Sequence, residues 1–201
     1  MKIDKLSYQH QKNGPYFFKD LTFELEEGRL HALHGKNGVG KSVLLHLLSR
    51  KFEKDAIFMH QKYDQTLASN FSFLENLQFA TLEKFPSPFS RLKKPSLLHF
   101  DLLEKFHIDP SLPIDQLSGG QRQIIALLMH LQRDTKIFLL DEPTAALDEQ
   151  NAMMVFEFLK SLQGITMIIV CHDQELLKRY TTGKHLHLTQ IDGLRQLDEI
   201  F

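Results

Sequence analysis

The segment "GKNGVGKS" (residues 35–42) places three glycines, a lysine and a serine directly after a short apolar run. Glycines let the backbone turn tightly, so that consecutive N–H groups point inward at phosphate oxygens. A helix that begins at Lys41 adds its positive N-terminal end. Lys41 is then placed to reach the β- and γ-phosphates, and the Ser42 hydroxyl to bind Mg²⁺. The spacing predicts a nucleotide site, with a plain glycine turn as the alternative.

A second candidate segment, "KIFLLDEPTAALD" (136–148), is an apolar strand that ends in two carboxylates. Asp141, at the C-terminal end of the strand, is placed to hold Mg²⁺ directly or through water. Glu142 would point at the γ-phosphate, where it could orient and deprotonate the attacking water. Adjacent acids at a strand end can also form a solvated turn. The phosphate loop upstream favours the catalytic interpretation.

A third segment, "LSGGQRQ" (117–123), opens a helix with a serine and two glycines. Ser118, Gly119 and Gly120 present N–H groups and a hydroxyl at a helix N-terminus, which is a second anion-binding arrangement. Ser118 could instead be a simple N-cap, which is a common use of serine. The two other segments favour an anion site here as well.

These segments need strands and helices that bring them together. Residues 1–30 alternate in short apolar and polar runs on either side of the loop 10–15, which predicts antiparallel strands. Buried strands are expected at 30–34, 55–61, 136–140 and 165–170, and helices at 41–50, 119–133 and 149–162. A terminal hairpin is expected around Asp192–Gly193. Alternating buried strands and helices indicate an α/β fold with a parallel sheet.

Between residues 71 and 115 the sequence pattern changes. Segments with helical periodicity lie on either side of "PSPFSRLKKPS" (86–96), a basic loop rich in proline and serine. We predict a helical subdomain, about residues 71–133, inserted into the strand–helix frame. The predicted fold is therefore a phosphate-loop NTPase core with a parallel sheet, an N-terminal antiparallel β-subdomain and this helical insertion. All of it falls in one domain, residues 1–201.

The composition of the chain narrows the classes of function that it can have. The chain has 24 Lys and Arg against 25 Asp and Glu, so no global charge favours nucleic acid or an acidic membrane. Its single cysteine, Cys171, fits a reducing compartment and a buried strand end. The N-terminus has no apolar core typical of a signal peptide, and no run approaches the ~18 apolar residues of a membrane span. We expect any membrane role to come through a partner.

Residues 28–172 resemble the nucleotide-binding domain of the ATP-binding cassette (ABC) family. The resemblance is carried by the phosphate loop, Gln61 after the next strand, "LSGGQ" (117–121), "LLDEPT" (139–144), "AALD" (145–148) and His172. It implies head-to-tail dimers in which the phosphate loop of one subunit and the "LSGGQ" segment of the other sandwich each ATP. In such a dimer Asp148 would lie at the seam.

The resemblance also implies roles for individual residues. Gln61 would contact Mg²⁺ and the water, and His172 would hydrogen-bond the γ-phosphate. The predicted catalytic residues are Glu142, His172, Gln61 and Lys41, and the predicted Mg²⁺ ligands are Ser42, Gln61 and Asp141. The predicted ATP-binding residues are Gly35, Lys36, Asn37, Gly38, Val39, Gly40, Lys41, Ser42, Ser118, Gly119, Gly120, Gln121 and His10.

The adenine contact departs from the family pattern, which usually supplies an aromatic side chain from the loop after the first strand. His10 stands at the expected position, with Tyr8 and Tyr16 as nearby substitutes. "HLH" (185–187) puts two histidines on one strand face, where metal binding is conceivable and a surface strand is favoured. Cys171 is expected to be structural rather than a nucleophile.

The resemblance implies an ATPase subunit of an ABC transporter that uses ATP and Mg²⁺. The first expected partner is a second cassette, which is either identical or different. Integral membrane permease subunits are expected to dock near Gln61 and residues 71–100. A substrate-binding protein is also an expected partner, and nucleic acid is not. Its expected location is the cytoplasm, on the inner face of the cell membrane. The alternatives are a non-transport ABC ATPase of the repair or translation type, and a regulatory module without hydrolysis. The transported substrate and its direction stay open.

Overall fold

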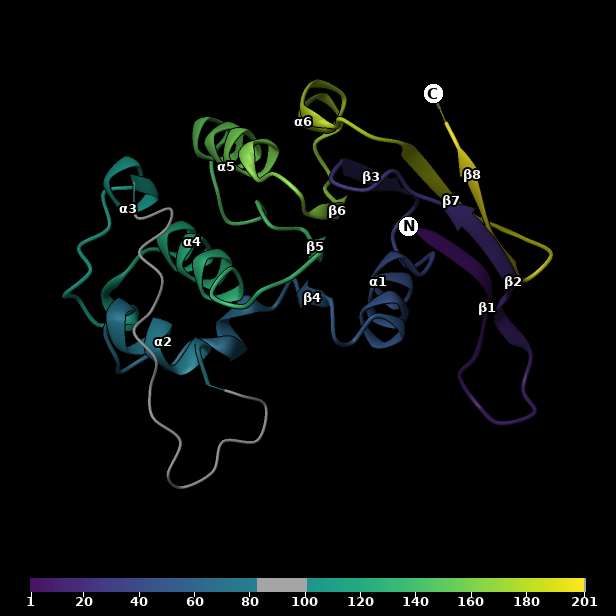
Figure 1. Cartoon of the computed structure of the whole chain (residues 1–201), viewed down its shortest axis with the longest axis horizontal. Helices are drawn as coiled ribbons and strands as arrows, with labels where there is room; N and C mark the ends of the chain where they lie inside the picture. The colour runs from purple at the N-terminus through teal and green to yellow at the C-terminus, as the bar shows by residue number, and fades with distance from the viewer. Residues whose placement is uncertain (83–100, 201) are drawn as a thin grey trace.

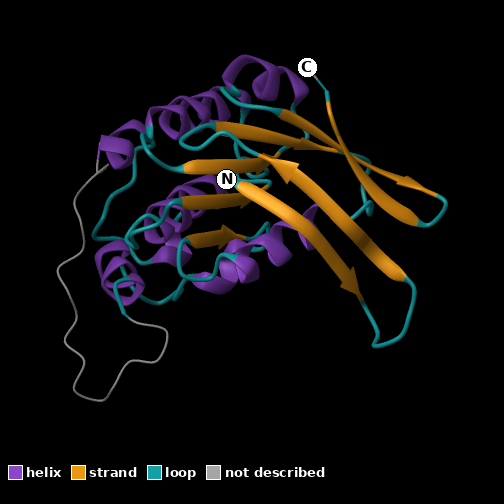
Figure 2. Cartoon of the chain, turned by 45° about the vertical axis from the view of Figure 1, so that its right-hand side comes forward, coloured by secondary structure: helices purple, strands orange, loops and turns teal. Residues whose placement is uncertain are grey.

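The computed structural model describes residues 1–82 and 101–200, and its framework is one eight-stranded sheet. The strand order is β1-β2-β8-β7-β3-β6-β5-β4 (Figures 1 and 2). Pairing is parallel from β7 through β3, β6 and β5 to β4, whereas β1–β2 and β7–β8 are antiparallel hairpins. The strands are β1 (Lys2–Gln9), β2 (Tyr16–Glu24), β3 (Leu30–His34), β4 (Ala56–Met59), β5 (Ile137–Asp141), β6 (Thr166–Val170), β7 (His185–Ile191) and β8 (Leu194–Glu199).

The central strands are buried on both faces, as expected for parallel strands covered by helices. In β5, Ile137 and Leu139 belong to the core cluster that includes residues of α1 (Lys41–Lys51). Phe138 and Leu140 belong to the other cluster, which includes residues of α4 (Gly119–His130), α5 (Glu149–Ser161) and α6 (Gln174–Tyr180). Because β5 is held from both sides, the two carboxylates at its end have a fixed position.

The helical insertion lies between β4 and β5. Its described elements are η1 (Tyr63–Thr66), α2 (Phe73–Ala80), α3 (Asp101–Lys105), η2 (Ile114–Gln116) and α4. The predicted basic loop 86–96 and the residues next to it, 83–85 and 97–100, lie outside the described residues. The α2 helix begins with a capping box in which Ser72 accepts from the Glu75 N–H and Glu75 accepts from the Ser72 N–H.

The terminal hairpin β7–β8 forms around Asp192–Gly193 as predicted, and it lies between the N-terminal hairpin and β3. β8 pairs in parallel with β2, where Phe18 is opposite Arg195. The N-terminal hairpin is therefore joined to the core sheet through the last strands of the chain. The periodicity of a strand predicts which of its faces is buried. It does not predict which other strand pairs with it, so this neighbour could not be predicted from the sequence.

Some predicted boundaries were wrong by a few residues. The expected strand 55–61 is only Ala56–Met59, and the expected helix 119–133 ends at His130. Leu131 is the C-cap of α4, so the helix is already closed before Arg133. Such shifts are usual at element ends, where hydrogen bonds to the flanking loop decide the boundary.

Candidate functional site

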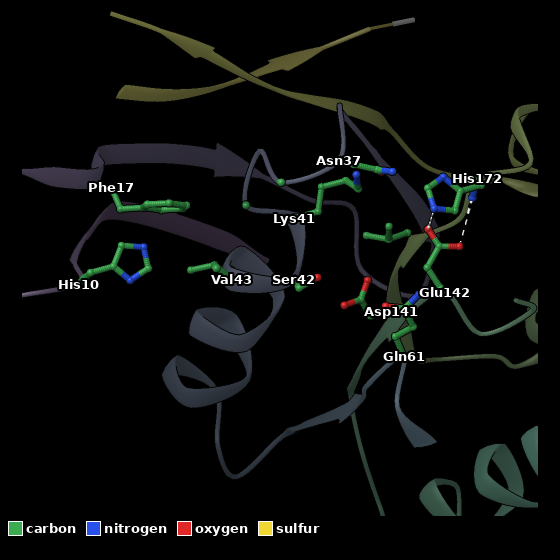
Figure 3. A pocket seen from close by; sticks show the side chains of 13 residues that line it. His10, Phe17, Asn37, Lys41, Ser42, Val43, Gln61, Asp141, Glu142 and His172 are labelled. Carbon is green, nitrogen blue, oxygen red and sulfur yellow. Dashed lines mark hydrogen bonds and ion pairs between the residues drawn. The ribbon is translucent and has the colours of Figure 1, made fainter. Parts of the chain in front are cut away.

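The phosphate loop, the end of β5 and the end of β6 meet at one cavity of about 460 Å³. The cavity is long, with His10, Phe17 and Val43 at one end, Gln61, Asp141, Glu142 and His172 at the other, and Lys41 and Ser42 between them (Figure 3). Its described lining residues are His10, Phe17, Asn37, Gly38, Gly40, Lys41, Ser42, Val43, Gln61, Asp141, Glu142, Val170 and His172. Ten of these are predicted site residues, drawn from five separate segments of the chain.

Lys41 is the first residue of α1, and its side chain turns back over its own loop. Its Nζ donates to the carbonyl oxygens of Gly35 at 2.7 Å and of Lys36 at 3.2 Å. The ammonium is thus held above the loop by neutral acceptors, which a phosphate oxygen could replace with a stronger, charge-assisted hydrogen bond. The N-terminus of α1 has no side-chain cap, so its N–H groups remain available to an anion.

Two glycines of the loop are required by close packing as well as by the turn. Gly40 has φ +113°, and a Cβ there would lie 2.6 Å from Cε1 of Phe17. Gly35 has φ +145°, and its Cβ would lie 2.6 Å from the Leu188 carbonyl oxygen. Both backbone angles are unfavourable for residues with a side chain. The loop is therefore fitted against β2 on one side and against β7 on the other.

The two carboxylates lie buried at the far end of the cavity. Asp141 is 7% exposed and Glu142 is 6% exposed. Burial is the main cause that raises the pKa of Glu142, and Asp141 raises it further, while His172 opposes the shift. The carboxylate Oε1 lies 3.3 Å from His172 Nε2, and Oε2 accepts from the His172 N–H at 3.3 Å (Figure 3). A raised pKa and a fixed direction suit a carboxylate that takes a proton from water.

Oxygen donors for a hard divalent cation are gathered in the same place. Figure 3 shows the Ser42 hydroxyl and the Asp141 carboxylate facing the same part of the cavity, with Gln61 beside them. Hydroxyl, carboxylate and amide oxygens are the ligands that Mg²⁺ accepts, alongside water and phosphate. The three residues fit such an ion. Among the described residues, no group of three or more His, Cys, Asp or Glu side chains is arranged to hold a metal by itself.

Gln123 is a positioning residue that sequence reasoning missed. It is 1% exposed on α4, and its Nε2 donates to the Glu142 carbonyl oxygen at 3.1 Å. Its Oε1 accepts from the Ala146 N–H at 3.1 Å. A buried amide with both ends bonded to one turn fixes that turn. The available signal was a glutamine on the apolar face of the helix "GQRQIIALLMHL".

The other end of the cavity is aromatic. His10 lies there as expected, and Phe17, which the sequence did not single out, contacts it edge to face with ring centroids 4.6 Å apart. Tyr8 bonds His10 through its hydroxyl, at 3.4 Å from Nδ1, and is not among the lining residues. Tyr16 points to solvent with 42% exposure. Phe17 follows Tyr16 directly, and alternation along β2 turns it to the opposite face.

The "LSGGQ" segment is not part of this cavity. Ser118 is the N-cap of α4, where its Oγ accepts from the Gln121 N–H and Gln121 Oε1 accepts from the Ser118 N–H. Ser118 remains exposed at the surface. Gly120 is confined by Leu147, because a Cβ would lie 2.8 Å from that side chain. Ser118 is both a helix cap and an exposed residue, so the two alternatives considered for it are compatible.

Remaining loop and terminal residues have other surroundings. Gly35 and Lys36 line a neighbouring cavity of about 740 Å³, together with His34, His185 and His187. The two histidines of β7 do share one face, and His185 Nδ1 lies 2.9 Å from His34 Nε2.

Cys171 is buried, and burial raises the pKa of its thiol, which matches the expected structural role. Val39, a predicted ATP-binding residue, is also buried, and its backbone carbonyl oxygen accepts a hydrogen bond from Arg195 Nε.

The chain is similar in sequence and in fold to known proteins. The family model for the ABC transporter family matches residues 18–145. The chain is 31% identical to the energy-coupling factor transporter ATP-binding protein EcfA1 of Thermotoga maritima, over 96% of this chain and 81% of that protein. It is 30% identical to the ribose import ATP-binding protein RbsA of Bacillus licheniformis, over 77% of this chain and only 36% of that protein. The chain therefore spans only about a third of the length of RbsA.

A solved structure described as the dimeric structure of a bacterial ABC transporter cassette has the same fold. It superposes with a TM-score of 0.74 at 21% sequence identity, and the match covers 100% of this chain and 98% of that one. In the described part of the present chain, no helix is long and apolar enough to cross a membrane.

Proposed function

This chain belongs to the ABC transporter family, and we propose that it is an ATP-hydrolysing subunit that pairs with a second cassette around two ATP molecules and drives transport through separate membrane subunits. The carrying observation is the cavity itself, where a phosphate loop, two buried carboxylates, Gln61 and His172 converge. The alternative of a repair- or translation-type ATPase has no observation in its favour.

At the phosphate end, each residue has a distinct task. The Lys41 ammonium leaves the carbonyls of Gly35 and Lys36 and binds the β- and γ-phosphates. Ser42, Gln61 and Asp141 supply oxygen donors for Mg²⁺. An ion held there would supply positive charge against the phosphates, which would lower the barrier to phosphoryl transfer.

Hydrolysis itself needs a water aligned with the γ-phosphate. Glu142 accepts a proton from that water, and the raised pKa of Glu142 makes it a better base than an ordinary carboxylate. His172 Nε2 lies 3.3 Å from the Glu142 carboxylate, and 67% of the His172 side chain is exposed. The His172 backbone N–H holds Glu142 in place by donating to Oε2, and the ring can hydrogen-bond the γ-phosphate.

The second cassette completes the site. Ser118 is exposed and lies outside the cavity of its own chain, yet its helix N-terminus is suited to a phosphate. A two-fold arrangement uses both anion sites, since the Ser118 segment of one protomer covers the γ-phosphate held by Lys41 of the other. A cassette of the same fold has a solved dimeric structure, which supports the pairing of two cassettes.

The helical insertion offers a docking place for a membrane subunit, which would hold the chain peripherally at the inner membrane face. Phe71, Leu74 and Phe79 are 40%, 41% and 42% exposed, and the rings of Phe71 and Phe79 stack at 5.3 Å. Phe79 also lines a cavity of about 280 Å³, together with Met129 and His130 of α4. An exposed apolar patch beside a cavity favours contact with an apolar side chain or helix.

Purification from the native source tests this function. The wild-type chain, expressed from its own locus, should hydrolyse ATP and co-purify with an integral membrane protein. Phe79→Asp should release the membrane protein and leave basal ATPase activity unchanged. Tyr16→Asp is the matched control, because Tyr16 is equally exposed but lies on β2. Recovery of ribosomes or DNA in place of a membrane protein would support the non-transport alternative.

A further inference from the structure

Arg195, from the last strand of the chain, lies against the aromatic end of the nucleotide cavity. Its guanidinium carbon is 3.7 Å from the centre of the Phe17 ring, which is a close cation–π contact. Its Nε donates to the Val39 carbonyl oxygen at 3.3 Å, and its Nη1 donates to the Gly193 carbonyl oxygen at 3.1 Å. One side chain thus links the terminal hairpin, β2 and the phosphate loop.

We propose that Arg195 positions the Phe17 ring as the platform on which the base of the nucleotide stacks, and so sets the affinity for the base rather than for the phosphates. The inference rests on the proposed nucleotide site. It assigns a role in ATP binding to the terminal hairpin, a part of the chain that the sequence motifs leave without one.

The Phe17 ring is held by contacts from separate elements. Gly40 lies so close to it that a Cβ would come within 2.6 Å of the ring atom Cε1. Phe18 packs edge to face on it at 5.0 Å, and His10 does the same at 4.6 Å. With Arg195 also in contact, the ring has little freedom to turn. A pre-positioned ring loses less conformational entropy when a base stacks on it.

The charge of Arg195 strengthens the platform in a second way. A guanidinium over a ring is attracted by its negative face. The same cation draws electron density away from the ring, which favours stacking with an electron-rich purine. Arg195 is half-buried, so water screens this contact less than it would at an open surface.

A competing explanation is that Arg195 acts on the phosphate loop through the Val39 carbonyl. The two explanations differ in which part of the nucleotide is affected. Support of Phe17 changes binding of the base and leaves a base-free phosphate chain unaffected. Support of Val39 changes binding of both ligands equally.

Calorimetric titration with MgATP and with magnesium tripolyphosphate separates these explanations. Arg195→Gln should weaken MgATP binding by about three- to tenfold, the range expected for loss of a partly desolvated cation–π contact. Tripolyphosphate affinity should stay within about twofold of wild type. Arg195→Lys should restore part of the ATP affinity, because an ammonium also binds an aromatic face.

A double-mutant cycle identifies the partner. In a Phe17→Leu background, Arg195→Gln should have no further effect on ATP affinity, because the ring through which it acts is gone. Lys19→Gln is the matched control, since Lys19 lies 5.8 Å over the Tyr16 ring on the same strand, away from the cavity. It should change neither ligand's affinity.

Equal losses for both ligands, additive effects of Phe17→Leu and Arg195→Gln, or wild-type ATP affinity in Arg195→Gln would each overturn the inference. If wild-type protein binds neither ligand, the nucleotide site itself is wrong. Circular dichroism of each variant confirms that it is folded before titration.

Discussion

At the residue scale, the proposed chemistry of the site depends most on Glu142. It is buried, it has a raised pKa, and its backbone has a φ of +54°, which is uncommon for a residue with a side chain. Such a conformation costs about 1–3 kcal/mol and persists where surrounding structure holds it. Here the Glu142 N–H donates to the Val170 carbonyl, and the Glu142 carbonyl accepts from Gln123. The strain directs the carboxylate at the cavity.

Replacing this carboxylate tests its role as the base. Glu142→Gln keeps the size of the side chain and an acceptor for the His172 N–H, but it removes the base. Single-turnover hydrolysis should slow by roughly 10²–10⁴-fold while ATP still binds. Glu149→Gln, an exposed change in the first turn of α5, should have no effect. An unchanged single-turnover rate in Glu142→Gln would place the base elsewhere.

The raised pKa of Glu142 also predicts how the protein responds to pH. The base is active only when deprotonated, so hydrolysis should decline with falling pH at a higher pH than an unperturbed Glu, near about 4.3, would allow. Because the folded-state pKa lies above the unfolded value, the contribution of Glu142 to stability is fully present below the unfolded pKa. It is lost as pH rises through the folded pKa.

Parallel pH series of hydrolysis rate and of denaturation midpoint check both statements. The acid limb of the rate profile should disappear in Glu142→Gln along with most of the activity. The midpoint of that variant, relative to wild type, should rise as pH increases through the folded pKa. Superimposable stability profiles of the two proteins would show that Glu142 has the same pKa in both states.

At the element scale, two helices of the insertion begin in the same way but differ in their proposed use. Ser72 caps α2 and Ser118 caps α4, each with a reciprocal capping box. A serine cap contributes about 0.5–2 kcal/mol relative to alanine. Only Ser118 is proposed to face a phosphate of the partner subunit. Stability and activity can therefore be separated by substitutions at these two positions.

Aspartate is the informative replacement, because it is as good an N-cap as serine but carries negative charge. Ser118→Asp should keep the denaturation midpoint near wild type and abolish ATP hydrolysis through repulsion of the γ-phosphate. Ser72→Asp should leave both quantities unchanged. Ser118→Ala should lower stability by about 0.5–2 kcal/mol. Full ATPase activity in Ser118→Asp would mean that the α4 N-terminus does not approach the nucleotide.

At the scale of the whole molecule, the central question is whether two chains share each active site. Two ATP molecules bound only in the dimer would shift the equilibrium toward it. Glu142→Gln with MgATP should therefore move from monomer to dimer in sedimentation velocity, and ADP should leave it monomeric. A wild-type chain that hydrolyses ATP at full rate as a strict monomer would contradict the shared site.

A mixing experiment makes the same test through activity. Lys41→Ala and Ser118→Arg chains should each be inactive alone. In their mixed dimer, one site carries both substitutions and the other carries neither, so part of the hydrolysis should return. Mixing Lys41→Ala with Glu142→Gln is the control. In that pair both substitutions lie on the cavity side, so each site of the mixed dimer carries one of them and no activity should return.

The sequence by itself determined the α/β fold, the phosphate loop and the two carboxylates at the end of a buried strand. These features are local: a loop followed by a helix, or an apolar run followed by acids, has its meaning within about fifteen residues. The resemblance of the ordered motifs added Gln61 and His172. Ten of the predicted residues then proved to line one cavity.

The tertiary structure alone brought Phe17 and Arg195 to the aromatic end of the site, beside the expected His10. Phe17 and Arg195 are far apart in sequence and meet because β8 inserts between β2 and β7. It also decided that Gln123 holds the turn after Glu142, and that Ser118 lies outside its own chain's cavity. Periodicity encodes which face of an element is buried but not which distant element covers it, because strand order is set by packing of the whole sheet.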